Sequence, residues 1–391
     1  MTSRLEDPGG GIGGSDYSQE LPMYCPEDQY MPGNTLAGNY RPVLRGVERM
    51  RGVSEVKRTF AALLSKEFNL LPHVSPLAFV TGTGINDDLD GSELKSSVKF
   101  RVPNLKGSKR GIEVDLSTVQ ETHGFDAEVV QSLAKWKRCL CKKYGLCPGE
   151  GLVCDSLSIR KGYFGDPTHS NICDQWDWEL VITKEQRTLV FLHSVVRRIW
   201  RLVKETEREI RNTFPQLKHC QELPEEIRII TAEDLHATWP EEDVHGRENR
   251  AVNKWGAIFI QGMGWPMRDG SPPEEVRAPD YDDWNLNGDI IVQHPVTGYR
   301  HELSSMGIRV DSESLPKQLA HRRMEDRLQL PYHSSVMSGE VPLTIGGGIG
   351  ISRLAMLLLQ TGHIGEVQAG VWHPRHVQEA QDAGMDVIPS F

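Results

Sequence analysis

The most informative part of this sequence is Leu343-Thr-Ile-Gly-Gly-Gly-Ile-Gly-Ile-Ser-Arg353-Leu-Ala-Met-Leu-Leu-Leu359. Leu343 to Ile345 are typical of a short buried strand and Ile351 to Gln360 of an apolar helix, so we expect four glycines and Arg353 at a strand-to-helix turn. Glycine has no Cβ that would keep a flat or phosphorylated ligand away from the backbone. A cation on the first helical turn can bind phosphate or stack on a ring. The segment therefore predicts a nucleotide site.

Three common nucleotide motifs do not fit this segment. A P-loop needs a Lys-Ser/Thr pair after its last glycine, but Ile351 and Ser352 follow Gly350. A Rossmann fingerprint that starts at Gly346 would place its third glycine at Ile351 and would leave no chain for the second half of the domain. A kinase loop needs a downstream His-Arg-Asp segment, which the sequence lacks. The remaining alternative is a tight turn that binds no ligand.

Composition indicates a globular protein of one or two domains. The chain has 391 residues, of which 38% are hydrophobic, and a net charge of -10. That charge argues against a general nucleic-acid binder, because such proteins need a basic face to neutralise phosphates. No apolar run approaches the length of a membrane span and the first thirty residues contain no signal-peptide core. We therefore expect a cytoplasmic protein with no membrane or nucleic-acid partner.

The seven cysteines show no zinc spacing and are expected to be reduced thiols. Gly145-Leu-Cys147-Pro-Gly149 matches the Gly-x-Cys-x-Gly elbow of glutamine amidotransferases. That elbow should join a strand to a helix, whereas a lysine-rich, helical stretch precedes this one and Pro148 follows the cysteine. We therefore predict a loop here and not a nucleophile.

The pattern of apolar residues divides the chain into an extension and a folded domain. Residues 1–44 lack an apolar period and predict a flexible extension, and residues 45–391 predict one catalytic domain. The predicted elements in that domain are a helix from Val53, a proline-interrupted edge strand at Leu70–Val80, a long amphipathic helix with a capping box at Thr183, strands at Ala257–Gln261 and Gly288–Gln293, and a hairpin strand at Tyr299–Val310. We expect a mixed sheet flanked by helices.

Polar chemistry is concentrated in four further segments. Gln131 to Arg138 places a serine and three cations on a short helical or turn segment. In Asp174-Gln-Trp-Asp-Trp-Glu179, a strand would place Gln175, Asp177 and Glu179 on one face, opposite Asp174 and the tryptophans. Such a face suits an amine, an amide or a metal, although a solvated edge strand has the same pattern.

The other two segments are rich in carboxylates. Arg277-Ala-Pro-Asp-Tyr-Asp-Asp-Trp284 predicts an acidic loop, and Asp289 is expected to open the next strand. In the hairpin partner, Glu302 and Ser304 are expected to share one face. Carboxylates on neighbouring strands can hold Mg²⁺, which prefers oxygen ligands and shares them with phosphates. With the glycine segment they predict an ATP–Mg²⁺ site.

Seven ordered motifs together resemble ammonia-dependent asparagine synthetase, a family similar to the catalytic domain of class II aspartyl- and asparaginyl-tRNA synthetases. They are the glycine segment, Ser-Leu-Ala-Lys-Trp-Lys-Arg (132–138), Gly-Glu-Gly-Leu (149–152), Asp-Gln-Trp-Asp-Trp-Glu (174–179), Arg-Ala-Pro-Asp-Tyr-Asp-Asp-Trp (277–284), Leu-Asn-Gly-Asp (286–289) and Glu-Leu-Ser-Ser-Met-Gly-Ile-Arg-Val-Asp (302–311). The similarity covers roughly Val53 to Trp372.

The resemblance implies an α+β fold with a mixed, largely antiparallel sheet. It also implies that ATP and L-aspartate give β-aspartyl adenylate and pyrophosphate, after which ammonia displaces AMP to give L-asparagine. A homodimer through the region near Val53 to Val80 is expected on the same basis.

The same resemblance assigns roles to individual residues. Arg160 matches the arginine that holds the α-phosphate and the reacting carboxylate, and Arg353 matches the one at adenine and the γ-phosphate. Further nucleotide contacts are expected at Arg277, Gly346, Gly348 and Gly350. The positions expected to hold Mg²⁺ or phosphate are Asp289, Glu302 and Ser305.

The amino-acid pocket matches Ser132, Lys137, Gln175 and Asp177. In it, Lys137 is expected to pair with a substrate carboxylate and Asp177 with the substrate ammonium group. Asp87 matches an aspartate near the amide end of the product and is the first candidate to receive ammonium and help to deprotonate it, with Asp282 second. A turn aspartate that satisfies local amides is the alternative for Asp87.

Two other functions remain open for such a core. A tRNA synthetase would need an anticodon-binding domain, which 44 flexible residues cannot form. A non-catalytic regulator should have lost the motif arginines or acids, but Arg160, Arg353, Asp289 and Glu302 are present. Glutamine-dependent synthetases need a cysteine after Met1, where this chain has Thr2. The choice between ammonia and glutamine as nitrogen donor stays open.

Overall fold

A single large sheet organises the molecule. The structure, a computed structural model, describes residues 40–87, 97–102, 124–160, 167–372 and 374–388. Within them, eight strands form one sheet, in the spatial order β1 (Leu70–His73), β5 (Gly151–Ile159), β6 (Ile172–Val181), β11 (Thr344–Gly350), β10 (Arg300–Arg309), β9 (Asp282–Gln293), β8 (Ala257–Gln261) and β7 (Arg228–Thr231). The outer pairs β1–β5 and β7–β8 are parallel and the five inner pairs are antiparallel, so the predicted mixed, largely antiparallel sheet is confirmed.

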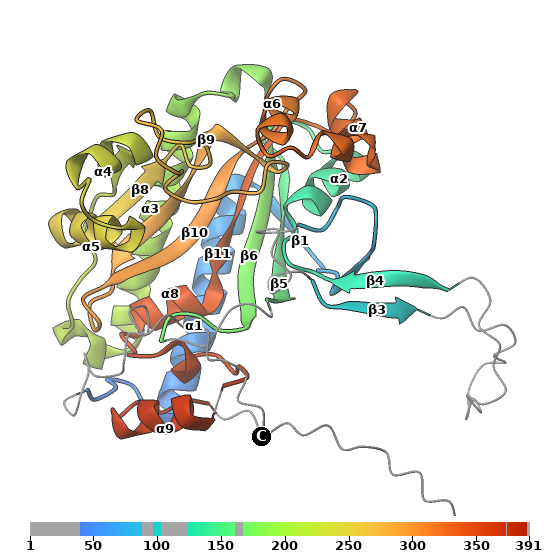
Figure 1. Ribbon diagram of the computed structural model, residues 1–391. Helices are drawn as coiled ribbons and strands as arrows, with labels where there is room; N and C mark the ends of the chain where they lie inside the picture. Colours follow the sequence, from blue (N-terminus) through green and yellow to red (C-terminus); the bar gives the residue numbers. More distant parts are fainter. Residues whose placement is uncertain (1–39, 88–96, 103–123, 161–166, 373, 389–391) are drawn as a thin grey trace, which may run out of the picture.

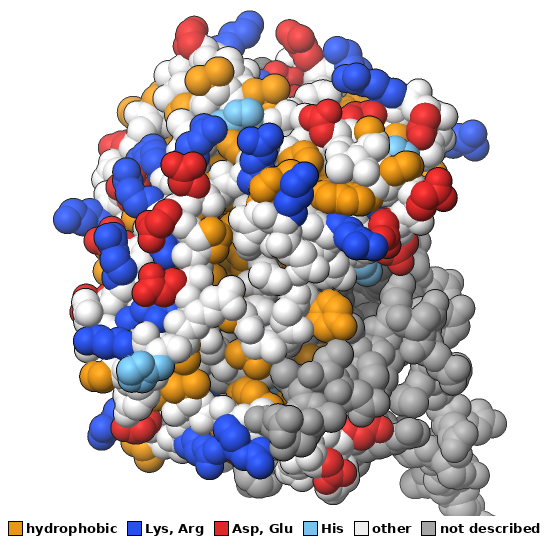
Figure 2. Space-filling model, turned by 90° about the vertical axis from the view of Figure 1, so that its left-hand side faces the viewer, with side chains coloured by type: hydrophobic (Ala, Val, Ile, Leu, Met, Phe, Trp, Pro, Cys, Tyr) orange, Lys and Arg blue, Asp and Glu red, His pale blue; other side chains and the backbone are white. Residues whose placement is uncertain are grey.

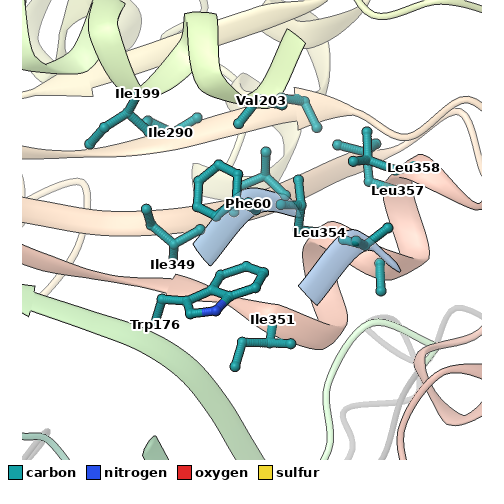
Figure 3. Packing of buried hydrophobic residues seen from close by; sticks show 14 of the residues in the cluster. Phe60, Trp176, Ile199, Val203, Ile290, Ile349, Ile351, Leu354, Leu357 and Leu358 are labelled. Carbon is teal, nitrogen blue, oxygen red and sulfur yellow. The ribbon is translucent and has the colours of Figure 1, made fainter. Parts of the chain in front are cut away.

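One face of this sheet is covered by a layer of helices and holds the main core (Figure 1). The layer consists of α1 (Gly46–Phe68), α3 (Leu189–Thr213) and α8 (Ile351–Leu358). Figure 3 shows Phe60 of α1 beside Trp176 of β6, with Ile199 of α3 and Leu354 of α8 around them. The two tryptophans of the Asp174–Glu179 strand, Trp176 and Trp178, are both buried here, as the alternation predicts.

Within the described residues, the opposite face is covered only towards its two sides. Val153 of β5 belongs to the main core, whereas its neighbours Leu152 and Cys154 pack with Leu140 of a helix on the other face. At the far side, Ile260 of β8 packs in a separate cluster beneath two helices. The helices on this face and beside it are α2 (Ala134–Tyr144), α4 (Ala232–Thr238), α5 (Val244–Trp255), α6 (Ser314–His321) and α7 (Pro331–Met337). The middle strands between them carry polar side chains.

Two smaller parts flank the large sheet. A three-stranded sheet of β2 (Ala78–Val80), β4 (Phe125–Val129) and β3 (Lys99–Val102) extends to one side (Figure 1). The last helix in the chain, α9 (Pro374–Asp382), lies near the start of α1 (Figure 1). No helix in the described ranges is both long and apolar enough to cross a membrane.

The predicted start of the folded domain at residue 45 is too late. Tyr40 and Leu44 are 7% and 1% exposed and belong to the main core. The hydroxyl of Tyr40 donates to Glu366 Oε2 at 2.9 Å, which ties the beginning of the described chain to its end. Residues 1–39 of the predicted extension lie outside the described residues.

The prediction of a glycine-rich turn is wrong in its geometry. Gly346, Gly347, Gly348 and Gly350 are part of β11, which pairs with β6 on one side and β10 on the other. Their φ angles are not positive, so glycine is not needed here for a left-handed backbone. A Cβ at Gly348 would lie 2.7 Å from the side chain of Gln175, and one at Gly346 would overlap the Glu179 carboxylate. These glycines are required for space, and pairing on both edges outweighs the low strand propensity of glycine.

Two element boundaries also differ from the prediction. The capping box at Thr183 caps the N-terminus of a short 3₁₀ helix at Lys184–Gln186 and not that of the long helix. The long helix has its own N-cap, Thr188, whose side chain accepts from the Phe191 N–H at 3.2 Å. Asp289 lies in the middle of β9 and does not open it, because the strand begins at Asp282.

A β-bulge changes which side chains of β10 share the open face of the sheet, so the predicted pair of Glu302 and Ser304 is wrong. The pairing with β9 shifts between Glu302 and Ser304, and both Leu303 and Met306 belong to the main core. Glu302 therefore shares the open face with Ser305 and not, as expected, with Ser304.

Basic and acidic side chains are interspersed on the face that carries α4 and α5. Figure 2 shows this mixture, in which neither sign of charge forms a continuous surface. The view agrees with a chain that carries 44 basic and 54 acidic residues.

Candidate active site

The open middle of the sheet contains a polar pocket. It lies over β6, β11 and β10 and reaches the first turn of α8. The residues lining it that the sequence predicts as nucleotide, substrate or metal contacts are Arg160, Gln175, Glu302, Ser305, Gly348, Gly350 and Arg353. Positions as far apart in the chain as residues 160 and 353 are therefore brought together as expected.

A row of paired residues crosses the floor of this site. In the register of the sheet, Asp177 of β6 is opposite Gly348 of β11, Gly348 is opposite Ser305 of β10, and Ser305 is opposite Asp289 of β9. Residues directly opposite one another point to the same face. Adjacent strands are about 4.8 Å apart, so this row spans about 14 Å. With no Cβ at Gly348, a flat floor separates the acidic group on β6 from the acidic group on β9.

Arg353 and Glu302 form the ion pair at one side of the pocket. The Arg353 guanidinium lies 3.2 Å from Glu302 Oε1 and donates to the Glu302 carbonyl at 3.1 Å. His301 Nε2 contacts the Arg353 carbonyl at 2.9 Å, which fixes α8 against β10. Burial would raise the pKa of Glu302, but Arg353, Arg300 and Arg277 together lower it to about 2. Glu302 is therefore an anion at neutral pH.

Arg277 lies among the residues predicted to hold Mg²⁺. Its guanidinium donates to Ser305 Oγ at 2.8 Å, pairs with Asp289 and lies 2.8 Å from Glu275. Burial raises the pKa of Asp289 well above its usual range despite Arg277, and the charges of Glu275 and Glu302 raise it further. Asp289 Oδ1 is buried without a hydrogen-bond partner in the described structure. This crowding of carboxylates would be relieved by a cation.

A chain of alternating charges fills the other side of the site. Lys137 Nζ pairs with Asp177, donates to the Trp178 carbonyl at 2.7 Å and lies 3.6 Å from Glu179. Arg309 holds both oxygens of Glu179, at 3.0 and 2.7 Å, and pairs with Asp282 at 2.5 Å. The two cations thus connect three carboxylates on two strands, β6 and β9.

Burial and pairing set the charges in this chain. Burial opposes the charge of Glu179, but Arg309 and Lys137 hold its pKa below the usual range. For Asp282, burial prevails and raises the pKa, although Arg309 counteracts it. The sequence predicts no role for Arg309. It places Glu179 only in the polar face shared with Gln175 and Asp177, and it does not predict the ion pair between Glu179 and Arg309.

Arg160 and Ser132 mark the edge of the site nearest α2. Arg160 directly follows β5; its backbone N–H donates to the Asn171 carbonyl at 3.0 Å and its guanidinium to the Gln131 carbonyl at 3.4 Å. Ser132 Oγ accepts from the Ala134 N–H at 3.2 Å at the start of α2. The Gln131 contact therefore links the predicted phosphate-binding arginine to the segment that presents Ser132 and Lys137.

Asp87 is buried in a separate charged cluster. Its Oδ1 lies 3.0 Å from Lys135 Nζ, and that nitrogen is 3.1 Å from Asp280 Oδ2. Asp87 is not among the residues that line the pocket. Lys135 and Asp280 had no predicted role, although both lie inside motifs that carry the resemblance.

Cys147 lies in an exposed turn between α2 and β5, as predicted. Its thiol donates a hydrogen bond to the Gly145 carbonyl at 3.9 Å, and no other hydrogen bond of Sγ is found among the described residues. Such a position gives the thiol no base to activate it.

The sequence matches one enzyme family over most of its length. The family model for aspartate-ammonia ligase matches residues 47–384. The aspartate–ammonia ligase of Lactiplantibacillus plantarum is 42% identical over 335 residues, which are 86% of this chain and 97% of that protein. The enzyme of the same name from Clostridium perfringens is 39% identical over 350 residues, 90% of this chain and 98% of that protein.

The fold is similar to that of class II aminoacyl-tRNA synthetases. Asparaginyl-tRNA synthetase of Entamoeba histolytica superimposes with a TM-score of 0.56 at 15% identity, over 82% of this chain and 66% of that longer chain. The Pyrococcus horikoshii enzyme, complexed with asparaginyl-adenylate, gives a TM-score of 0.55 at 14% identity over 83% and 70%. At such identities the likeness establishes the fold, as the resemblance implied. The sequence matches go further, and they show that this chain belongs to the aspartate-ammonia ligase family.

Proposed function

We propose that this chain makes L-asparagine from L-aspartate, ammonia and ATP through a β-aspartyl adenylate, releasing AMP and pyrophosphate. The observation that carries the proposal is the row Asp177–Gly348–Ser305–Asp289, which joins the charged group around Lys137 and Asp177 to the arginine and carboxylates around Asp289. Its span of about 14 Å suits an aminoacyl adenylate laid across the strands. The family of the chain and the adenylate bound to the synthetase of Pyrococcus horikoshii support this reading.

In the first half-reaction, an oxygen of the substrate side-chain carboxylate attacks the α-phosphorus of ATP. The bond to pyrophosphate breaks, and its electron pair leaves with pyrophosphate. We assign Arg160 to the α-phosphate, where a fixed cation stabilises the charge that develops. Arg353 and the glycine floor at Gly348 and Gly350 take the nucleotide, because all three line the pocket. Lys137 and Asp177 orient the aspartate by its charged groups.

In the second half-reaction, ammonia attacks the acyl carbon of the adenylate. A carbon–nitrogen bond forms, the carbon–oxygen bond to phosphate breaks with its electron pair going to AMP, and the nitrogen loses one proton. Only neutral ammonia is a nucleophile, so ammonium must first lose a proton to a base. We assign that base to Asp87 and keep Asp282 as the second candidate. Asp282 is paired with Arg309, as Asp87 is with Lys135.

Mg²⁺ is the metal that fits the carboxylates near Arg277. Asp289, Glu302 and Ser305 offer oxygen ligands, and Asp289 Oδ1 is buried without a hydrogen-bond partner in the described structure. No group of three or more His, Cys, Asp or Glu in the described residues forms a complete metal cage. An ion held here would therefore take further ligands from ATP phosphates and water, as Mg²⁺ usually does, and would neutralise charge on the leaving pyrophosphate.

The first edge of the large sheet suits a homodimer. On and after β1, Leu71, Val74 and Leu77 are 61%, 80% and 66% exposed. Several large apolar side chains at an edge strand are typical of an interface. A second copy of the chain is the partner we propose for this edge. Light scattering of the purified protein should give twice the mass of one chain, and Leu71→Lys with Val74→Lys should reduce it to one.

Cytoplasmic location is part of the same proposal. The six cysteines in the described part of the chain are free thiols, which suits a reducing compartment. ATP and aspartate as substrates fit that compartment as well.

The decisive experiment is an assay with ATP, Mg²⁺, L-aspartate and either ammonium or glutamine. We expect pyrophosphate, AMP and asparagine to form only when aspartate and a nitrogen donor are both present. Transfer of an amino acid to tRNA without asparagine formation would refute the proposal. Asp87→Asn should retain aspartate-dependent pyrophosphate exchange but slow amide formation, and equal losses in both would remove Asp87 from the mechanism.

A further inference from the structure

A second buried charge cluster lies beside the polar pocket. It joins the loop after β2, the first turn of α2 and the loop before β9 through Asp87, Lys135 and Asp280. The Asp280 oxygen that faces Lys135 also contacts His333 Nε2 at 2.9 Å and an Arg327 nitrogen at 3.1 Å. Four segments distant in the sequence therefore converge on one lysine and two carboxylates.

The burial of these groups is unusual for charged side chains. Lys135, Asp280 and Asp87 are 1%, 1% and 3% exposed. A lone buried carboxylate would take up a proton, because burial disfavours its charged form. For Asp280, Lys135, His333 and Arg327 outweigh burial and hold the pKa below its usual range. Burial would lower the pKa of Lys135, but the charges of Asp280 and Asp87 raise it above its usual value. Lys135 and Asp280 are therefore kept ionised by their neighbours.

Asp87 has fewer partners than Asp280. Asp280 Oδ2 contacts three side chains, whereas Asp87 has an ion pair only with Lys135 in the described part of the chain. Asp87 Oδ2, like Asp280 Oδ1, is buried there without a hydrogen-bond partner. A buried carboxylate oxygen in that state is costly unless it receives a donor. Ammonium is a donor of suitable charge.

The cluster adjoins the amino-acid end of the site. Lys135 and Lys137 lie on the same turn of α2, and Asp280 and Asp282 lie on either side of the half-buried Tyr281. Asp87, Asp282 and Arg277 all lie close enough to influence the pKa of the Tyr281 hydroxyl, which burial raises. The other group that faces Lys135 is the ring of Tyr332, whose centroid is 5.8 Å from Nζ.

We propose that Lys135 and Asp280 are positioning residues for the amide-forming half-reaction: Lys135 holds Asp87 by Oδ1 and leaves Oδ2 for ammonium, and Asp280, fixed by His333 and Arg327, offsets the charge of Lys135. Without Lys135, the buried Asp87 carboxylate loses the ion pair that holds it in place to receive ammonium. Without Asp280, the full charge of Lys135 cancels that of Asp87 and repels ammonium. The inference rests on the proposed function, since it assigns Asp87 its partner.

The test separates the two half-reactions in the full-length protein. Aspartate-dependent pyrophosphate exchange measures adenylation, and asparagine formation is followed against ammonium concentration at neutral and alkaline pH. Lys135→Gln should leave exchange near the wild-type rate and reduce kcat/KM for ammonium by about 100-fold, a typical loss for a disabled proton transfer. The loss should shrink at alkaline pH, where more of the nitrogen is already neutral ammonia. Lys135→Arg should restore part of the activity.

Lys142→Gln is the matched control, because Lys142 is on the same helix, is 43% exposed and pairs only with Glu340 among the described residues. It should change neither half-reaction. Asp280→Asn should raise KM for ammonium with exchange retained, and it tests the proposal even where Lys135→Gln fails to fold. Equal losses of exchange and amide formation in both variants, or unchanged ammonium dependence, would overturn the proposal. Absence of exchange in the wild-type protein would instead overturn the proposed function.

Discussion

The two faces of the central sheet are built from the same strands but are stabilised by different interactions. On β6, Trp176 and Trp178 pack into an apolar core, while Asp177 and Glu179, their immediate neighbours, are held by Lys137 and Arg309 on the other face. The first face is stabilised by the removal of apolar surface from water. The second buries charges that are tolerated only because each has a partner. Strand alternation thus separates stability from chemistry at a spacing of one residue.

The largest effect on stability is expected on the apolar face. Trp176→Ala removes a side chain that is 2% exposed and packs on Phe60 at a ring-centroid distance of 4.8 Å. The free energy of unfolding should fall by about 3–5 kcal/mol. Denaturant titration measures the change, with Val190→Ala as the control, because Val190 is 80% exposed. A loss below about 1 kcal/mol would mean that this face is not packed as described.

The largest effect on chemistry is expected on the polar face. Arg160→Ala should reduce aspartate-dependent pyrophosphate exchange by about 10²–10³-fold, the usual loss for one fixed group that stabilises transition-state charge. Stability should change little, because Arg160 lies beyond the end of β5. The matched control is Arg58→Ala on α1, because the Arg58 side chain is 68% exposed. Retained exchange in Arg160→Ala would remove this residue from the phosphate site.

A smaller effect on stability and substrate binding is expected at Gly348, on the floor of the site. In Gly348→Ala the new Cβ would lie 2.7 Å from the Gln175 side chain, so Gln175 must move. Overpacking of this kind costs about 1–3 kcal/mol. The KM for aspartate should rise at the same time, because Gln175 lines the pocket. Gly339→Ala serves as a control for glycine replacement in general, since open space surrounds that position, although its positive φ adds some strain.

A double variant makes the cause of the Gly348 effect measurable. Gln175→Ala in the Gly348→Ala background should recover stability, because the clashing atoms are gone. If it does not, the clash is not the cause of the loss. A shift in KM without loss of stability would instead indicate that the methyl group obstructs the ligand directly.

The sequence predicts the apolar face better than the polar one. Alternation alone places Trp176 and Trp178 in the core, and helical periodicity finds the helices that contain Phe60 and Ile199. These patterns depend only on neighbours along the chain. The segment at Gly346 to Gly350 was predicted as a turn, because the pairing of β11 with β6 and β10 is non-local and no local pattern reports it.

The ion pairs on the polar face are also non-local, so local sequence patterns do not predict them either. The motifs identify Lys137, Asp177 and Asp282, but they do not reveal that Arg309 of β10 joins Glu179 of β6 to Asp282 of β9. A β-bulge on β10 further shifts Glu302 to the face of Ser305, and a bulge has no reliable sequence signal. Residue types were therefore predictable, whereas their pairing required the sheet.

The smallest expected effect is a loss of stability at acidic pH, and it should come only from the polar face. The pKa of Glu302 is lowered from 4.5 to about 2, since Arg353, Arg300 and Arg277 outweigh its burial. A carboxylate with a lowered folded-state pKa stabilises the protein above the unfolded value, and this contribution is lost as the pH falls towards 2. Between pH 5 and pH 3 the loss from this group should be roughly 1–2 kcal/mol, reduced by its partial exposure.

Denaturant titrations of wild type and Glu302→Gln at pH 5 and pH 3 measure this loss of stability. The variant should lose less stability on acidification than the wild type, and Trp176→Phe, on the opposite face, should lose the same amount as the wild type. Equal acid sensitivity in wild type and Glu302→Gln would mean that the arginines do not hold this carboxylate as an anion, and the phosphate side of the site would then lack the fixed charge pattern on which the assignment of Arg353 rests.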